Sequence, residues 1–167
     1  MNVELLKAIV ILPGTALVYI PGALLWFTSA DMAPAEIAGT RFWIGLVVAA
    51  IGLVMAVWTV RLFVTVGKGT PAPWAPPERL VVRGPYRHVR NPMIMDVLLM
   101  LGGESLVFGS WPVAGWMLAF FLLNSLYFVR VEEPSLERRL GEDYRRYKSN
   151  VPRWIPRPTP WEAGRTR

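Results

Sequence analysis

Four long apolar runs constrain the fold of this chain more strongly than any other feature. They cover 5–27, 42–66, 92–108 and 111–129, and most polar residues gather between and after them. The first run holds 23 residues, which would rise about 34 Å as a helix and so exceed a hydrocarbon core of about 30 Å. We therefore predict an all-α, polytopic integral membrane protein with about four transmembrane helices.

The first run could instead belong to a signal peptide that is removed after export. The apolar part of a signal peptide is only about 7–15 residues long, and Lys7 gives the run a weak basic start. We therefore predict a retained span. Pro13 and Pro21 should kink it, which membrane helices tolerate.

The chain changes character where the apolar runs end. Only Gly109 and Ser110 separate the third and fourth runs, so we predict a helical hairpin there. Residues 130–167 hold ten Lys and Arg against six Asp and Glu. Tyr144 and Tyr147 recur at helical spacing within them, so 132–148 is expected to form a cytoplasmic amphipathic helix on the membrane surface.

The basic residues indicate how the chain crosses the membrane. They are concentrated in the 61–90 connection and after residue 129, whereas the two other connections together carry only Arg41. Because cytoplasmic loops are enriched in Lys and Arg, we place both termini and the 61–90 connection in the cytoplasm.

Composition also excludes several kinds of site. The formal net charge of +6 fits an acidic lipid surface better than nucleic acid, so we predict the lipid bilayer as a partner and no nucleic acid. The chain has no Cys and one His. A disulfide framework and a thiol nucleophile are therefore excluded, and no metal site is expected.

A polar segment at 83–95 reads Arg-Gly-Pro-Tyr-Arg-His-Val-Arg-Asn-Pro-Met-Ile-Met. Pro85 disfavours helix at the residue before it, whereas Pro92 can open the third run because the first helical turn needs no proline N–H. We therefore predict a loop that brings its residues to the mouth of a buried helix. The adjacent Glu132 and Glu133 would be costly if left unpaired, and Arg87, Arg90 or Arg130, or else a cationic ligand, could balance them.

Taken together, these motifs resemble the isoprenylcysteine carboxyl methyltransferase and phospholipid methyltransferase superfamily. The similarity covers about 70–157 and rests on the 83–93 segment, the hairpin, Glu-Glu-Pro-Ser-Leu, Leu-Gly-Glu-Asp-Tyr-Arg-Arg-Tyr and Val-Pro-Arg-Trp-Ile-Pro. It implies a membrane enzyme that moves a methyl group from S-adenosylmethionine to a lipophilic acceptor. The resemblance places the cofactor pocket among the last helices, the central loop and the C-terminal segment.

The resemblance also implies that the cofactor contacts fall on 78–81, Tyr86, 91–94 and Glu132, and the chemistry of the cofactor adds the neighbouring charged residues. Apolar side chains at 80–81 would line the adenine, the two carboxylates would hold the ammonium group and balance the sulfonium, and arginines or the helix start would take the methionine carboxylate. The candidate cofactor residues are Glu78, Leu80, Val81, Tyr86, Arg87, Arg90, Asn91, Pro92, Met93, Ile94, Glu132 and Glu133.

Three residues are candidates for contacting the methyl acceptor or for acting as a base during its methylation. Asp96 and Glu104 lie eight residues apart in the third run, and charged groups at such depth usually face the protein interior. Asp96 would orient the acceptor or act as a base, and Glu104 would contact Asn124 or an acceptor headgroup. Both could equally serve helix packing. Arg130 lies close to Phe128, the position at which the resemblance implies a substrate-contacting arginine.

His88 could serve as a general base because its ordinary pKa lies near neutrality, or it could be a surface polar residue. We treat 1–167 as one membrane domain, with a helical pair at 1–66, a methyltransferase-like half at 67–157 and a tail at 158–167. The sequence leaves two alternatives open: a membrane sterol or isoprenoid reductase that uses NADPH, and a non-enzymatic membrane scaffold.

Overall fold

The computed structural model describes residues 3–28, 39–68 and 78–162, and every regular element within them is helical. The all-α prediction is therefore confirmed for this part of the chain. The elements are α1 (Val3–Gly14), η1 (Thr15–Tyr19), α2 (Ile20–Phe27), α3 (Thr40–Leu62), η3 (Phe63–Gly67), η4 (Gly84–Arg87), α4 (Pro92–Phe108), α5 (Trp111–Tyr127), η5 (Phe128–Glu132) and α6 (Glu133–Asn150). Here η4 is a 3₁₀ turn, and the other η elements are π turns within continuous helices.

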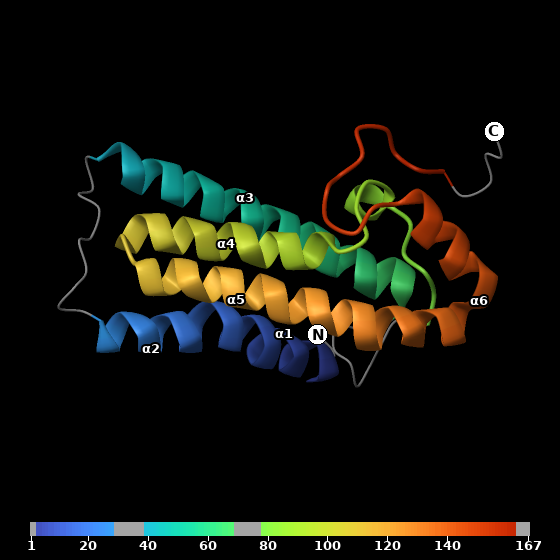
Figure 1. The fold of residues 1–167 in the computed structure, drawn as a ribbon, viewed down its shortest axis with the longest axis horizontal. Helices are drawn as coiled ribbons and strands as arrows, with labels where there is room; N and C mark the ends of the chain where they lie inside the picture. The colour runs from blue at the N-terminus through green and yellow to red at the C-terminus, as the bar shows by residue number, and fades with distance from the viewer. Residues whose placement is uncertain (1–2, 29–38, 69–77, 163–167) are drawn as a thin grey trace.

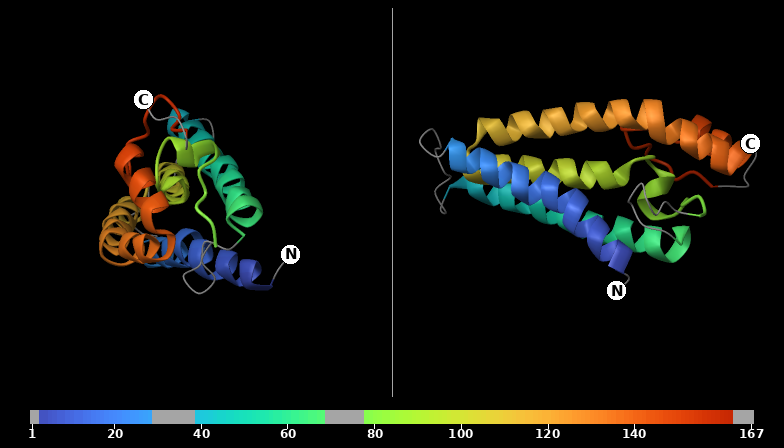
Figure 2. Two further views of the ribbon diagram at one scale, coloured as in Figure 1. Left: turned by 90° about the vertical axis from the view of Figure 1, so that its right-hand side faces the viewer. Right: turned by 90° about the horizontal axis from the view of Figure 1, so that it is seen from below.

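The long helices run side by side, with α4 between α3 and α5 and with α2 packed beside α5 (Figure 1). Successive helices α3, α4 and α5 run in alternating directions. Figure 2 shows from two further sides that η4, α6 and residues 151–162 gather at one end of this bundle. The described residues therefore form a long helical body that carries η4, α6 and residues 151–162 at one end.

Three helical stretches are long and apolar enough to cross a membrane. They are Val10–Phe27, Thr40–Gly67 and the continuous helix that begins at Trp111. The chain is thus an integral membrane protein. Helix α4 has only 17 residues and falls short of that length, so the fourth span remains a prediction.

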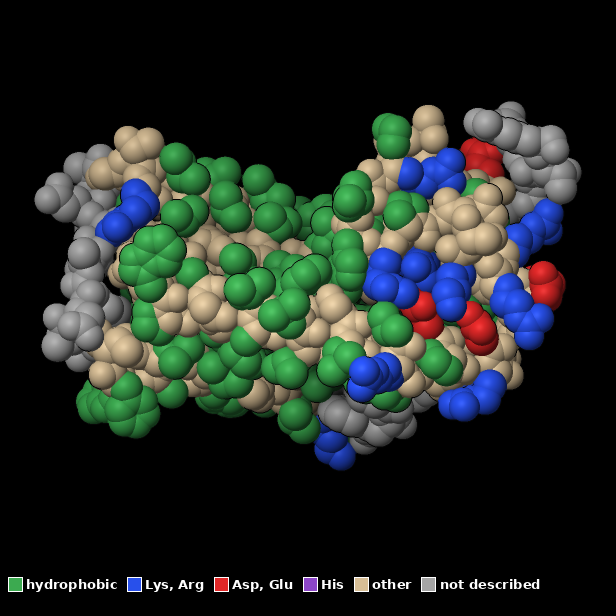
Figure 3. Space-filling model, viewed as in Figure 1, with side chains coloured by type: hydrophobic (Ala, Val, Ile, Leu, Met, Phe, Trp, Pro, Cys, Tyr) green, Lys and Arg blue, Asp and Glu red, His purple; other side chains and the backbone are tan. Residues whose placement is uncertain are grey.

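The surface of the body is apolar in the way that a lipid environment requires. Large side chains such as Trp43, Val54 and Leu123 are more than half exposed. Figure 3 shows apolar side chains over the long body, whereas most of the Lys, Arg, Asp and Glu visible on this face gather at the end that carries α6. This distribution suits a body that lies in hydrocarbon and an end that lies in water.

Glycines bring α3 and α4 almost into backbone contact. A Cβ atom added at Gly103 would lie 2.6 Å from the carbonyl oxygen of Gly45, and one added at Gly52 would lie 2.8 Å from the carbonyl oxygen of Asp96. Small residues at such positions allow close van der Waals packing between membrane helices. This contact holds Asp96 directly against α3.

The predicted hairpin is confirmed. Gly109 ends α4 with a left-handed φ of 61°, a conformation that favours glycine. The Ser110 hydroxyl then accepts a hydrogen bond from the Val113 backbone N–H at 3.4 Å and caps α5. The turn between α4 and α5 therefore consists of Gly109 and Ser110, as the spacing of the two apolar runs predicted.

The chain itself covers the apolar face of α6. Tyr144 and Tyr147 are almost fully buried and form a cluster with Val151, against which Leu80 and Trp161 pack. The tyrosines that suggested an amphipathic helix on the membrane surface thus face residues of 78–82 and 151–161. Whether α6 also rests on lipid, and on the cytoplasmic side, remains a prediction.

Candidate functional site

The central segment, which we define as 78–91, places its polar residues at the N-terminal end of α4. Gly84 opens η4 with a left-handed φ of 53°, and Tyr86 is then buried beside the ring of Phe63, with ring centres 5.4 Å apart. Asn91 has a non-helical φ of −118°, and Pro92 occupies the first turn of α4. This confirms that Pro92 opens the third apolar run.

The C-terminal segment, which we define as 151–162, is hydrogen-bonded to the central segment. The backbone N–H groups of Arg157 and Trp161 donate to the carbonyl oxygens of His88 and Arg87 at 3.0 and 2.9 Å. In the other direction, the Arg87 guanidinium donates to the Trp161 carbonyl oxygen and to Glu162, both at 2.9 Å. The sequence assigned 158–162 to a tail, but these residues pack against the candidate site.

His88 is held by the C-terminal segment. Its Nδ1 atom lies 2.8 Å from the Arg157 carbonyl oxygen. The ring is therefore fixed by a structural contact, which favours the polar structural role over that of a general base. Arg157 also donates to the Asn150 carbonyl oxygen at 2.8 Å, so the same residue joins His88 to the end of α6.

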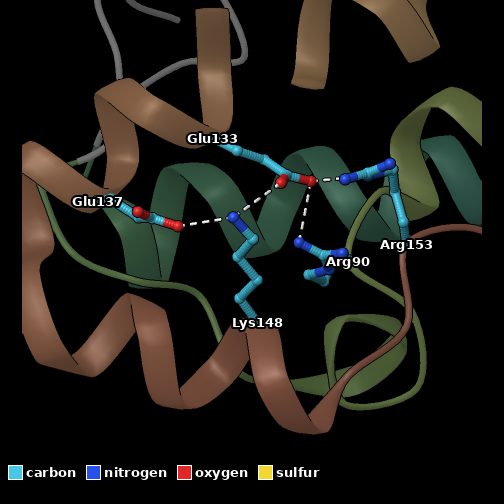
Figure 4. A network of polar contacts seen from close by, with 5 residues as sticks. All are labelled: Arg90, Glu133, Glu137, Lys148 and Arg153. Atoms are coloured by element: carbon cyan, nitrogen blue, oxygen red, sulfur yellow. Dashed lines mark hydrogen bonds and ion pairs between the residues drawn. The ribbon is translucent and has the colours of Figure 1, made fainter. Parts of the chain in front are cut away.

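Glu133 is the centre of an ion-pair network (Figure 4). Its carboxylate accepts from Arg90 at 2.9 Å, from Arg153 at 2.7 Å and from Lys148 at 3.3 Å, and Lys148 also pairs with Glu137 at 2.6 Å. Glu133 is only 3% exposed, so its charge needs these partners. A ligand cation would have to displace them. We therefore assign Glu133 to joining the central segment, α6 and the C-terminal segment.

Tyr86 lies close enough to two carboxylates, Asp96 and Glu132, to feel their charges. Burial raises the pKa of its phenol well above the ordinary value, and the nearby Tyr147, Asp96 and Glu132 raise this pKa further. The phenol is therefore protonated at any physiological pH and can donate a hydrogen bond. Its oxygen is buried and has no partner. The structure thus brings together Tyr86, Glu132 and Asp96, which lie far apart in the sequence.

Several further polar atoms near this end are buried without partners. They include the Asn91 side-chain Nδ2 and the Asp96 Oδ1. Buried polar atoms normally find a hydrogen-bond partner, so an unpartnered group suggests a missing water or ligand. The other Asp96 oxygen, Oδ2, accepts a hydrogen bond from the Thr59 hydroxyl at 2.8 Å. Asp96 therefore serves helix packing through one oxygen and leaves the second free.

A groove of about 420 Å³ lies beside this cluster, between α3, α4 and the C-terminal segment. Figure 3 shows a hollow on the upper edge of the molecule, where the long body meets the polar end. The central segment lines the groove with Gly84, Pro85, Arg87, His88 and Val89. The helices contribute mainly Met55, Trp58, Met95, Asp96 and Leu99, and the C-terminal segment contributes Pro156 and Pro160. Most of these side chains are apolar, and Asp96 is the carboxylate among them.

The other sequence candidates are more widely spread. Leu80 packs into the tyrosine cluster under α6, and the Glu78 backbone N–H donates to the Gly67 carbonyl oxygen at 2.9 Å. Glu104 lies about two turns beyond Asp96 on α4. Asn124 donates to the Phe120 carbonyl oxygen at 2.8 Å, and within the described residues no hydrogen bond joins it to Glu104.

The remaining candidates lie near the two helix ends. Val81 is buried, Met93 and Ile94 lie in the first turn of α4, and Arg130 is exposed on η5. Sequence reasoning missed Thr59, the partner of Asp96. The sequence did indicate it, because Thr59 is a polar residue within the apolar run 42–66.

Comparisons with known proteins agree with the motif pattern. A family model described as phospholipid methyltransferase matches residues 40–143, which is more than half of the chain. A Haemophilus influenzae protein described as uncharacterized is 33% identical over 63 residues, which is 38% of this chain and all of that protein. No solved structure matches.

Proposed function

The chain belongs to the phospholipid methyltransferase family, and on this premise we propose that it transfers a methyl group from S-adenosylmethionine to a lipophilic acceptor in the membrane. One observation supports the site of this reaction. The unpartnered, buried phenol of Tyr86 lies near the carboxylates of both Glu132 and Asp96, at the end of an apolar helical bundle.

The residues present fit the cofactor. Its ammonium group and sulfonium call for a carboxylate, and Glu132 supplies one while Glu133 remains paired within the chain. Its uncharged polar atoms call for donors, and the buried Tyr86 hydroxyl and Asn91 amide are without partners. The first turn of α4 offers backbone N–H groups and a positive dipole end for the methionine carboxylate. When bound, the cofactor supplies an electrophilic methyl group.

The protein's contribution is alignment and exclusion of water. The C-terminal segment lies across the central segment, and Pro156 and Pro160 form one wall of the groove beside Asp96. Transfer to a neutral amine or hydroxyl releases a proton, which the free Oδ1 atom of Asp96 can accept. Asp96 would therefore orient the acceptor and act as its base.

Binding of S-adenosylhomocysteine in detergent, measured by calorimetry, tests the assignment. We expect binding to the wild-type chain, and binding at least about tenfold weaker to Glu132→Gln, because that change removes one charged hydrogen bond. Glu142→Gln is the matched control, since Glu142 is an exposed residue of α6. Equal affinity of both variants would remove Glu132 from the site.

The same titration with NADPH distinguishes the alternatives. Binding of NADPH instead of S-adenosylhomocysteine would favour the reductase, and binding of neither would favour a scaffold. The proposal requires a response to S-adenosylhomocysteine alone.

We further propose that the end carrying α6 faces the cytoplasm. The 61–90 connection and the residues after 129 carry sixteen of the eighteen Lys and Arg, and their described parts lie mainly at this end (Figure 1). The donor nucleotide would then reach the site directly from the cytoplasm, and the acceptor from the inner leaflet.

A further inference from the structure

The groove beside Asp96 opens on the apolar flank of the bundle. Its walls include Trp58 of α3 and Leu99 of α4, and these side chains are 49% and 36% exposed. Both belong to helices whose outer surface is apolar. The apolar chain of a molecule dissolved in the bilayer can therefore reach the groove from the side of the bundle.

The floor of the groove carries one unpartnered acceptor. Asp96 is 1% exposed, and its Oδ2 atom is fixed by the Thr59 hydroxyl at 2.8 Å. Its Oδ1 atom is buried and has no partner. Such an atom is stabilised by a group that donates a hydrogen bond and is destabilised by a second anion.

The cationic side chain at the rim is engaged elsewhere. Arg87 lines the groove, but its guanidinium is bonded to the Trp161 carbonyl oxygen and to Glu162. The groove therefore offers an anionic floor and apolar walls, while the nearest arginine is held by the C-terminal segment.

We propose that this groove holds one apolar chain of an amphiphile whose headgroup, an amine or a hydroxyl, donates a hydrogen bond to Oδ1 of Asp96. This inference rests on the proposed function and narrows its acceptor, because a headgroup that is a carboxylate is disfavoured. The groove volume of about 420 Å³ is near the lower end of ligand pockets, about 300–1,000 Å³, and suits a single chain.

Three probes with the same chain separate the headgroup classes. Dodecylamine, dodecanol and dodecanoate, each brominated at the end of the chain, are added to the protein in detergent, and quenching of tryptophan fluorescence is followed. We expect saturable quenching by the amine and the alcohol, and affinity at least about tenfold lower for the carboxylate. Stronger binding of the amine than of the alcohol would assign part of the preference to charge.

Trp58→Phe locates the binding. Trp58 forms one wall of the groove, so its removal should abolish most of the saturable quenching. Trp111→Phe is the matched control, because Trp111 is 87% exposed at the start of α5 and lies outside the groove lining. Saturable quenching that survives in Trp58→Phe would overturn the proposed location.

Asp96→Asn tests the role of the carboxylate. The new amide oxygen can accept from Thr59, which turns the amide NH₂ toward the groove and replaces an acceptor by a donor. We expect the preference to reverse, with dodecanoate binding about tenfold more tightly and dodecylamine about tenfold more weakly than to the wild type. Asp143→Asn on the exposed face of α6 should leave all three affinities unchanged.

The outcomes separate this inference from the proposed function. Equal affinity of the wild type for all three headgroups overturns the inference, whether or not Asp96→Asn folds. If S-adenosylhomocysteine binds the same preparation, the methyltransferase proposal survives that failure. A headgroup preference without S-adenosylhomocysteine binding would keep the groove assignment and remove the methyltransferase.

Discussion

Glu132 and Glu133 are adjacent in the chain, yet their carboxylates have different surroundings. Glu133 is balanced by Arg90, Lys148 and Arg153. Glu132 lies near the buried phenol of Tyr86. One residue of the pair therefore serves the fold, and the other is the carboxylate that we propose for the ligand.

Glu133→Gln should lower the stability of the fold. Removing one partner of a buried ion pair costs about 3–5 kcal/mol, and we expect the lower end, about 3 kcal/mol, because Lys148 and Arg153 reach solvent. A fall in the thermal unfolding midpoint in detergent measures the effect. Glu142→Gln removes an exposed pair with Arg145 and should change stability by no more than about 0.5 kcal/mol. Equal midpoints for the two variants would contradict the network.

Burial of Tyr86 should make the stability of the protein depend on pH in the alkaline range. Folding raises the pKa of this phenol, so its contribution is complete below the ordinary tyrosine pKa of about 10 and is lost as the pH rises from there toward the folded value. The difference in unfolding midpoint between wild type and Tyr86→Phe should therefore shift against the wild type above about pH 10. A difference that stays constant from pH 8 to 11 would show that Tyr86 is not buried as described.

At the scale of elements, glycines determine how α3 and α4 pack. Gly103→Ala would place a methyl group 2.6 Å from the Gly45 carbonyl oxygen, and such overpacking typically costs about 1–3 kcal/mol. Gly115→Ala on α5 is the control, because nothing lies within 4 Å of its added Cβ atom. We expect a lower unfolding midpoint and weaker probe binding in the groove for Gly103→Ala alone. If both variants behave like the wild type, the helices are further apart than described.

The elements themselves were largely predictable from sequence. Three features each permit few structures. They are apolar runs that are longer than soluble helices need, the two-residue separation at Gly109 and Ser110, and the position of Pro92. The buried face of α6 was less predictable. Tyr144 and Tyr147 mark an apolar face equally well whether it meets lipid or Leu80, because periodicity indicates which face is apolar and not what covers it.

The site was predictable only in part, for a related reason. Motif order drew attention to Tyr86, Asn91 and Glu132, but their surroundings depend on contacts between distant segments. Thr59 and Asp96 are 37 residues apart, and sequence spacing contains no sign of their hydrogen bond. Arg153 was not among the candidate partners of Glu133, because a Pro-rich segment gives no periodicity from which to place it.

At the scale of the whole molecule, the ends of the helical bundle predict which parts of the chain lie on each side of the membrane. The chain has no Cys, so a single introduced cysteine is a unique label. Val3→Cys and Ser149→Cys should react with an impermeant maleimide from the cytoplasmic side, and Thr40→Cys from the opposite side. All three positions are exposed in the structure. Labelling of Ser149→Cys and Thr40→Cys from the same side would contradict the arrangement of α3 to α6 across the membrane.

The contacts between the C-terminal segment and Arg87 also impose an order on biosynthesis. Trp161 and Glu162 leave the ribosome after every helix of the bundle has been made, yet they hold residues that lie near the middle of the chain. The polar end can therefore be completed only after Trp161 and Glu162 have been made. A nascent chain arrested before Val151 would carry helices α1 to α6 and still lack the segment 151–162, which is hydrogen-bonded to the central segment.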